Sequence, residues 1–114
     1  MKKFNEFSIS AFVATVPEVK EFEKSSVARF CLSVSHTENK GDEKSTKTAL
    51  LPVEKWISND KKDELKDLKG KYVGCHGFFR PDTWEEEGKK RSKIIFAVTK
   101  LEILTMKDNE DGKE

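Results

Sequence analysis

Apolar and polar residues alternate with a period of two along much of this chain, which is the pattern of β-strands with one buried face. The clearest run is residues 27–35, and similar runs occupy residues 4–16, 48–57, 72–80 and 92–99. The sequence therefore predicts five strands. The inward face of the clearest strand is formed by Ala28, Phe30, Leu32 and Val34.

Three details of these strands predict local irregularity or unusual burial. Phe12 lies on the polar side of the first strand, which predicts a bulge or a curved strand there. Pro52 has no backbone N–H to donate to a ladder, so the third strand has a bulge or a free edge at that residue. The last strand, residues 92–99, is apolar and β-branched, which is typical of a strand buried on both faces.

The segments between the strands are polar. We expect residues 37–46 to form a loop, and residues 81–91 to form a long charged connection between the last two strands. Residues 58–70 predict a short helix, which Ser58 or Asn59 can cap and which a glycine ends.

The order of these elements predicts the fold class. Three strands, a helix and two further strands give an all-β, five-stranded OB-fold barrel, with one short helix between strands 3 and 4 and a long β-hairpin between strands 4 and 5. A ferredoxin-like fold needs a helix after its first strand, and residues 16–26 are too short and too polar for one. We expect residues 1–106 to form one domain and residues 107–114 to form a charged, flexible tail.

The charges of the chain nearly balance, with 22 Lys and Arg against 21 Asp and Glu. A net charge of +1 neither requires nor excludes a polyanionic partner, so such binding would depend on local basic patches. No apolar run is long enough for a membrane span, and the N-terminus has no apolar signal segment. We therefore expect a cytoplasmic protein that does not contact membranes.

Four side chains could nominally serve as zinc ligands: Cys31, Cys75, His36 and His76. Cys75 and His76 are adjacent in a predicted strand, so they point to opposite faces and cannot share a metal ion easily. Two cysteines are also too few for a disulfide framework in a chain of this size. We expect buried thiols, no metal and no cofactor.

The connection between the last two strands combines an aromatic side chain with cations. Trp84 lies among charged residues, and a basic cluster follows it. A β-finger of this kind suits a flat, anionic partner that can stack, such as single-stranded nucleic acid. The alternative for Trp84 is a hairpin tip that packs onto a partner subunit. The candidate phosphate contacts, which could also be ordinary solvated charges, are Arg29, Arg80, Lys89, Lys90, Arg91 and Lys93.

Four other residues each have two possible roles. Trp56 lies on a strand with no cleanly apolar face, so it either stacks on bases or packs in the core. Tyr72, His76 and Phe78 line up on one outward face of a strand. This stripe is either a secondary nucleic-acid platform or an oligomer interface, and we favour the interface.

From Phe7 to Leu104 the chain resembles the bacterial single-stranded DNA-binding proteins. Four local matches carry the resemblance, and they occur in the family's order and spacing. They are Pro17-Glu18-Val19, the strand from Val27 to Val34, Leu68-Lys69-Gly70, and the hairpin Gly77-Phe78-Phe79-Arg80…Trp84…Gly88. The resemblance implies an OB fold, base stacking by Trp56 and Trp84, and a homo-oligomer, either a dimer or a tetramer.

The chain also departs from the family pattern. Leu50 and Glu38 stand at two of the family's four stacking positions, and Ala11 and Ala14 replace glycines of its first strand. The family ends in a long linker and an acidic tip with a Pro-Phe pair, whereas this chain ends in residues 108–114 without an apolar tip. These departures favour a short paralogue, either truncated, specialised or from a mobile element, with weaker stacking, and they argue against recruitment of repair enzymes through such a tip.

The function that we expect is sequence-independent binding of single-stranded DNA in replication, recombination or repair, with replication proteins as possible partners. The alternative is an OB-fold protein-interaction module, such as a primosome or replisome accessory, with weak nucleic-acid binding. We do not expect an enzyme. The acids Asp82 and Glu85–Glu87 lie on a loop without a rigidly held His or Lys, which is typical of a solvated turn.

Overall fold

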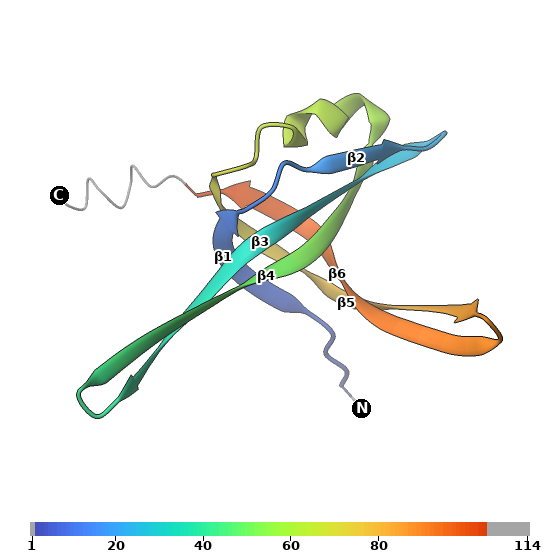
Figure 1. Cartoon of the computed structure of the whole chain (residues 1–114). Coiled ribbons are helices and arrows are strands. Elements are labelled where there is room, and N and C mark those ends of the chain that lie inside the picture. The colour runs from blue at the N-terminus through green and yellow to red at the C-terminus, as the bar shows by residue number, and fades with distance from the viewer. Residues whose placement is uncertain (1, 105–114) are drawn as a thin grey trace.

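The computed structural model describes residues 2–104, in which six strands surround one core and a single short helix lies at one end (Figure 1). The elements in chain order are β1 (Phe7–Val13), β2 (Glu18–Glu21), β3 (Ser25–Lys40), β4 (Glu43–Ser58), the 3-10 helix η1 (Asn59–Leu65), β5 (Tyr72–Glu86) and β6 (Lys89–Ile103). The predicted tail, residues 107–114, lies outside the described residues.

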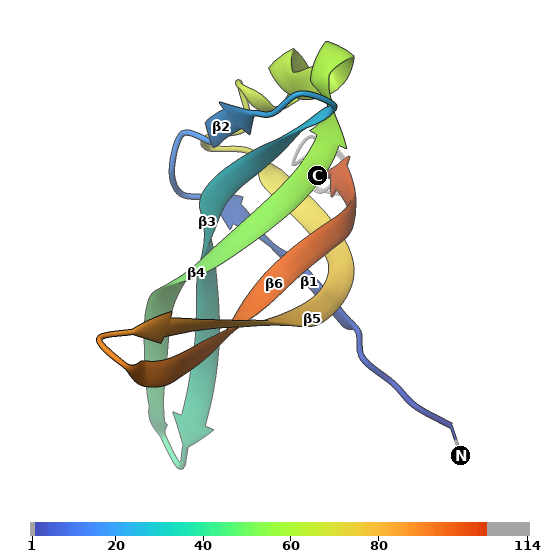
Figure 2. The same ribbon diagram turned by 90° about the vertical axis from the view of Figure 1, so that its right-hand side faces the viewer.

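The sheet closes into a barrel because β1 pairs on both of its sides. Its strand order is β1-β5-β6-β4-β3-β2. β1 pairs antiparallel with β5 from Phe7 to Phe12, and then with β3 at Phe12 and Val13. The pairing of β4 with β6 is parallel, and Figure 2 shows these two strands side by side across the barrel wall. The predicted all-β OB barrel is confirmed, with five barrel strands and the four-residue β2 added at one edge.

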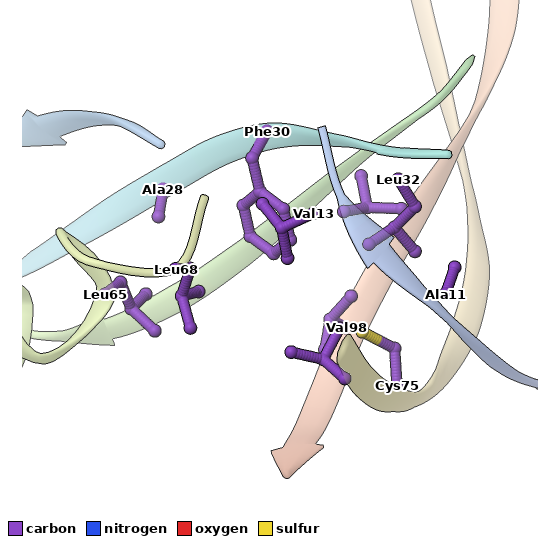
Figure 3. Packing of buried hydrophobic residues seen from close by; sticks show 11 residues of the cluster. Ala11, Val13, Ala28, Phe30, Leu32, Leu65, Leu68, Cys75 and Val98 are labelled. Carbon is purple, nitrogen blue, oxygen red and sulfur yellow. The ribbon is translucent and has the colours of Figure 1, made fainter. Parts of the chain in front are cut away.

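The core is built by the inward faces that the alternation predicts. Ala28, Phe30 and Leu32 of β3 are buried, and Leu65 and Leu68 cover one end of the barrel (Figure 3). The buried cluster comprises Ala11, Val13, Ala28, Phe30, Leu32, Val53, Leu65, Leu68, Val73, Cys75 and Val98. Burial of apolar side chains at these positions supplies the main driving force for folding.

Gly77 marks a bulge where the pairing of β5 with β6 shifts register, between His76 and Gly77. A Cβ atom at Gly77 would lie 1.9 Å from the carbonyl oxygen of Ala97, so the two backbones approach more closely here than any side chain allows. Phe7, Phe79 and Phe96 pack around this point with ring centroids 5.0–5.6 Å apart.

The predicted long β-hairpin between the last two strands is confirmed, whereas the loop predicted at residues 37–46 is wrong in extent, because β3 and β4 continue almost to the tip. β3 and β4 stay paired to Lys40 and Glu43, and cross-strand hydroxyl hydrogen bonds stabilise this arm: Ser35 with Thr48 and Thr37 with Thr46, both at 2.8 Å. β5 and β6 stay paired to Glu86 and Lys89. The connecting Glu87 and Gly88 both have positive φ (52° and 78°), as a two-residue turn of type I′ requires.

The strand edges settle two further expectations. Phe12 is where β1 changes its partner from β5 to β3, so the predicted curvature is present. Pro52 stays in register opposite Cys31, and the paired stretch of β4 with β6 begins only at Val53. Pro52 therefore lies at a free edge, where its missing N–H costs no ladder bond.

Three expectations about local structure are wrong. The helix is shorter than residues 58–70. Ser58 makes no side-chain cap hydrogen bond, and the Asn59 side-chain amide donates to carbonyls of the turn before β3. The last strand is not buried on both faces, since Ile94 is exposed and only Ala97 and Val98 are buried in succession. The charged segment after β1 also contains a strand, β2, whose Glu18 pairs with Arg29 of β3.

Candidate nucleic-acid interface

The outer face of β4, β6 and β5 carries two exposed aromatic side chains at its centre. Cross-strand pairing aligns Glu54 with Ala97 and Ala97 with Phe78, so side chains two residues away on each strand share this face. Trp56 and Phe78 both line a shallow groove of about 540 Å³, together with Glu54, Arg80, Ala97, Val98 and Thr99. Trp56 is 48% exposed, so it is not a core residue.

The same face continues onto the β5–β6 arm. On β5 the alternation leads from Phe78 and Arg80 to Trp84, and the cross-strand partner of Trp84 is Arg91. Trp84 is 41% exposed, and the Lys93 ammonium lies 5.9 Å from its ring centroid. The structure therefore places both tryptophans on one continuous outer face, with cations beside the ring on the arm.

A buried acid joins two of the predicted phosphate contacts. Glu54 is only 5% exposed, and its carboxylate accepts hydrogen bonds from Arg80 Nη2 and from Arg29 Nε, the latter at 3.3 Å. Burial alone would raise the pKa of Glu54, but the hydrogen bonds and charges of Arg80 and Arg29 outweigh burial and lower this pKa. The three side chains line a larger groove of about 720 Å³ that reaches Lys93.

This arrangement limits what Arg29 and Arg80 can contribute. Two guanidinium groups share one carboxylate, so the network carries one net positive charge. The side chains of Arg29 and Arg80 are still 55% and 38% exposed, so each keeps donors free for a phosphate. Sequence reasoning missed Glu54, because its strand has no cleanly apolar face and the two arginines that pair with it lie on other strands.

The basic cluster on the arm does not act as one patch. Lys89 and Lys90 lie opposite Glu86 and Glu85 in the ladder, and Arg91 Nε lies 3.6 Å from Glu86 Oε1. Alternation puts Arg91 on the face of Trp84 and Lys90 on the opposite face. Only part of the predicted cluster therefore lies beside the aromatic ring.

The predicted stripe of Tyr72, His76 and Phe78 has two different sets of neighbours along β5. Tyr72 and His76 bond to β1, with Tyr72 Oη 3.0 Å from Ser10 Oγ and His76 Nδ1 2.8 Å from Ser8 Oγ. Phe78 lies beyond the bulge and lines the groove of Trp56 instead. The structure thus groups Phe78 with the candidate nucleic-acid face and the other two with the outer face of β1.

Two residues of the face were not found from the sequence. The Phe22 ring stacks on Trp56 with centroids 5.5 Å apart and an interplanar angle of 25°, and the Lys20 ammonium lies 5.3 Å from the Phe22 centroid. A lone aromatic within the charged segment of residues 16–26 was the available signal.

Cys75 and His76, two of the four possible zinc ligands, lie in different surroundings. Cys75 is buried in the core, and burial raises the pKa of its thiol to about 11, whereas His76 points outward to Ser8. Their predicted opposite orientation is confirmed. Among residues 2–104, no group of three or more His, Cys, Asp and Glu side chains is placed to hold a metal ion.

Within the same range, no helix has the length and apolar character needed to cross a membrane.

Comparison with curated proteins places the chain in a family, although no family model matches the sequence. A curated relative from Nostoc sp., single-stranded DNA-binding protein 1, is 32% identical over 106 residues, which cover 88% of this chain and 82% of the relative. The chain belongs to the single-stranded DNA-binding protein family. A second member, the single-stranded DNA-binding protein of Treponema pallidum, is 26% identical over 78 residues, which cover 68% of this chain but only 44% of that relative.

Solved structures agree with the fold of this family. The SSB of Plasmodium falciparum, solved in complex with ssDNA, superposes with a TM-score of 0.75 at 19% identity, and the match covers 92% of this chain and 98% of that one. At this identity the likeness supports the OB barrel itself, and it does not assign roles to individual side chains.

Proposed function

We propose that this chain binds single-stranded DNA without sequence preference, through base stacking and phosphate contacts. The observation that carries the proposal is one continuous outer face that holds three exposed aromatic side chains, Trp56, Phe78 and Trp84, with cations beside them. Every base has a π-face, so such a surface holds single strands of any sequence. Membership of the single-stranded DNA-binding protein family supports the proposal.

The contacts divide between bases and backbone. Trp56, Phe78 and Trp84 stack on bases, each stack being worth about 1–3 kcal/mol. The phosphate contacts are Arg29, Arg80, Lys89, Arg91 and Lys93, with Lys90 contributing less because it faces away from Trp84. Leu50, at a position where the family usually has a tryptophan, provides no stack, so we expect weaker binding per protomer than in members with four aromatic residues.

The proposed activity is binding without catalysis, and the names of the relatives, which state binding alone, support this. Action in replication, recombination or repair, a cytoplasmic location and contacts with replication proteins stay predictions.

A homo-oligomer, either a dimer or a tetramer, is part of the proposal. β1 pairs with β3 only at Phe12 and Val13, so the rest of this short strand has β5 as its sole ladder partner among the described residues. The exposed Phe12 ring packs on Tyr72, with centroids 4.9 Å apart, beside this edge. An open strand edge next to an exposed aromatic ring is suited to a second copy. Light scattering at micromolar concentration tests this, and a monomer would contradict it.

A second candidate function is protein interaction. It is favoured by two exposed apolar side chains, Leu50 and Ile94, which have no aromatic ring to stack on a base. The two functions are separated by titrating dT oligomers and duplex DNA of equal length. We expect clear preference for the single strand. Equal or tighter duplex binding, or no binding to either, would overturn the proposed function and favour the protein-interaction module.

A further inference from the structure

The turn between β2 and β3 presents an aromatic ring on the surface where nothing in the fold requires one. Phe22 is 42% exposed and stacks on Trp56, and the Lys20 ammonium lies over the Phe22 ring. Phe22 and Trp56 together form a contiguous exposed aromatic pair, and contiguous exposed apolar patches commonly mark binding sites. The stack joins Phe22 directly to the groove that Trp56 and Phe78 line.

Hydrogen bonds hold this turn in one conformation. The Phe22 N–H donates to the Ser25 carbonyl at 2.8 Å, which closes the turn. From η1, Asn59 Nδ2 donates to the carbonyls of Phe22, at 2.9 Å, and Glu23, at 3.3 Å. The buried Ser26 hydroxyl donates to Asn59 Oδ1, which fixes the amide orientation. The Phe22 ring is therefore positioned before any ligand arrives, and little ordering entropy is lost on binding.

Strand pairing shows that this ring extends the same face. Lys20 lies opposite Val27, and Val27 lies opposite Trp56, so Lys20 and Trp56 project to one side of the sheet. A single-stranded nucleic acid that extends from the Trp56 groove toward β2 would reach Phe22 and Lys20 next. The acid Glu21 points to the other side and pairs with Lys62 at 2.7 Å, whereas Glu18 shares the face and lies opposite Arg29.

We propose that Phe22 and Lys20 form a further nucleotide subsite next to Trp56, in which Phe22 contacts a base and Lys20 its phosphate. The inference rests on the proposed function, because it assigns an additional contact on the same path. A base stack is a stronger contact than a cation over an exposed ring, so a base can displace the Lys20 ammonium from Phe22 toward the backbone phosphate. The subsite would offset part of the loss at Leu50.

The test is oligomer length dependence in matched variants. Affinities for dT oligomers of about 4 to about 16 nucleotides, the span of OB-fold site sizes, are measured for the parent, Phe22→Ala and the control Phe4→Ala, which removes another exposed phenylalanine. We expect Phe22→Ala to lose about 5- to 100-fold on long oligomers and to match the parent on the shortest ones. Phe22→Tyr should restore binding, and thermal unfolding verifies that each variant is folded.

A substitution at Lys20 provides an independent test that leaves the stack of Phe22 on Trp56 in place. Lys20→Ala should reduce the slope of log affinity against log salt by about 0.7 on long oligomers, as expected for one phosphate contact on a single strand. The control Lys24→Ala, on the same turn, should leave the slope unchanged.

Three outcomes would overturn the subsite while leaving the proposed function intact. One is Phe22→Ala binding like Phe4→Ala at every length. Another is an equal loss at every length, which would mean that Phe22 only supports Trp56. The third is an unchanged salt slope in Lys20→Ala. Failure of the parent to bind any dT oligomer would instead refute the proposed function itself.

Discussion

Two long hairpin arms extend from the same barrel, one formed by β3 and β4 and the other by β5 and β6 (Figure 1). In both, antiparallel pairing continues to a two-residue turn at the tip. The β3–β4 arm is joined across its strands by hydroxyl pairs, such as Thr37 with Thr46. The β5–β6 arm instead carries Trp84 with Arg91 opposite and Lys93 near its ring.

Under the proposed function, the difference means that the side chains of a projecting ribbon, and not its backbone, decide whether it contacts nucleic acid. The hydroxyl groups and His36 on the β3–β4 arm can hydrogen-bond a partner, but this arm has no tryptophan. The β5–β6 arm offers a ring and adjacent cations, which is the combination that single strands require. Four predictions compare the two arms or the barrel wall between them.

The largest effect should come from the root of the β5–β6 arm. A methyl group in Gly77→Ala would meet the Ala97 carbonyl oxygen at 1.9 Å, and a backbone atom cannot move aside cheaply. We expect destabilisation of about 4–5 kcal/mol or failure to fold, which is at the extreme of single substitutions. The matched control is Gly74→Ala, whose added Cβ would have its nearest contact at 3.5 Å, an ordinary distance. Chemical denaturation measures both, and similar stabilities would contradict the close approach at the bulge.

The next effect separates the arms by function. Trp84→Ala should weaken binding of dT oligomers by about 1–3 kcal/mol, the value of one base stack. Its stability should change little, because the side chain lies on the arm and is exposed. His36→Ala, an exposed position on the β3–β4 arm, should bind like the parent. Equal losses in the two variants would mean that the arms do not differ in their contact with DNA.

Glu54 on the barrel wall should affect stability in a pH-dependent manner. Hydrogen bonds to charged groups contribute about 1.5–3 kcal/mol, and partly exposed arginines reduce this, so Glu54→Gln should cost about 1–2 kcal/mol at pH 7. The folded-state pKa of Glu54 lies below its ordinary value of 4.5, so the carboxylate stabilises the fold above that pH. This contribution is lost as pH falls from 4.5 through the folded-state pKa. Denaturation curves of parent and variant should therefore converge in acid, and a constant difference would contradict the network.

The smallest effect is electrostatic and compares the cations of the arms. Replacing Lys89, Lys90 and Arg91 by Ala should flatten the salt dependence of binding by about 0.7 for each phosphate that the variant no longer neutralises. We expect the decrease to correspond to fewer phosphates than the number of cations removed, since Lys90 faces away from Trp84. The matched variant on the β3–β4 arm replaces Lys40, Lys44 and Lys47. If its slope falls as much, general positive charge explains binding better than the face of Trp84.

The barrel could be predicted from the sequence because β3 alternates cleanly and the order of the other apolar segments fits an OB fold. The inward face of β3 follows from its apolar positions alone. The arms could not be delimited in this way, since polar strands that project into solvent have no buried face to produce alternation. Threonine pairs and a Glu-Gly turn with positive φ hold the arms instead, and these depend on partners across the hairpin.

The site was harder to predict than the fold. Trp56, Phe78 and Arg80 come together only because β6 lies between β4 and β5, a pairing that local patterns do not reveal. The outward stripe of β5 contacts β1 at Tyr72 and His76 and the Trp56 groove at Phe78, which depends on strand pairing across the barrel. Phe22 was missed because it reaches Trp56 through a turn held by the side chain of Asn59.

The central claim is that both tryptophans of the chain stack on bases, and intrinsic fluorescence tests it most directly. Adding poly(dT) should quench most of the emission, because stacking brings each indole against a nucleobase. Trp84→Phe and Trp56→Phe should each retain a quenched signal from the remaining tryptophan. Emission that poly(dT) leaves unchanged in the folded parent would contradict the claim, and the outer face of β4, β6 and β5 would not be a single-strand binding surface.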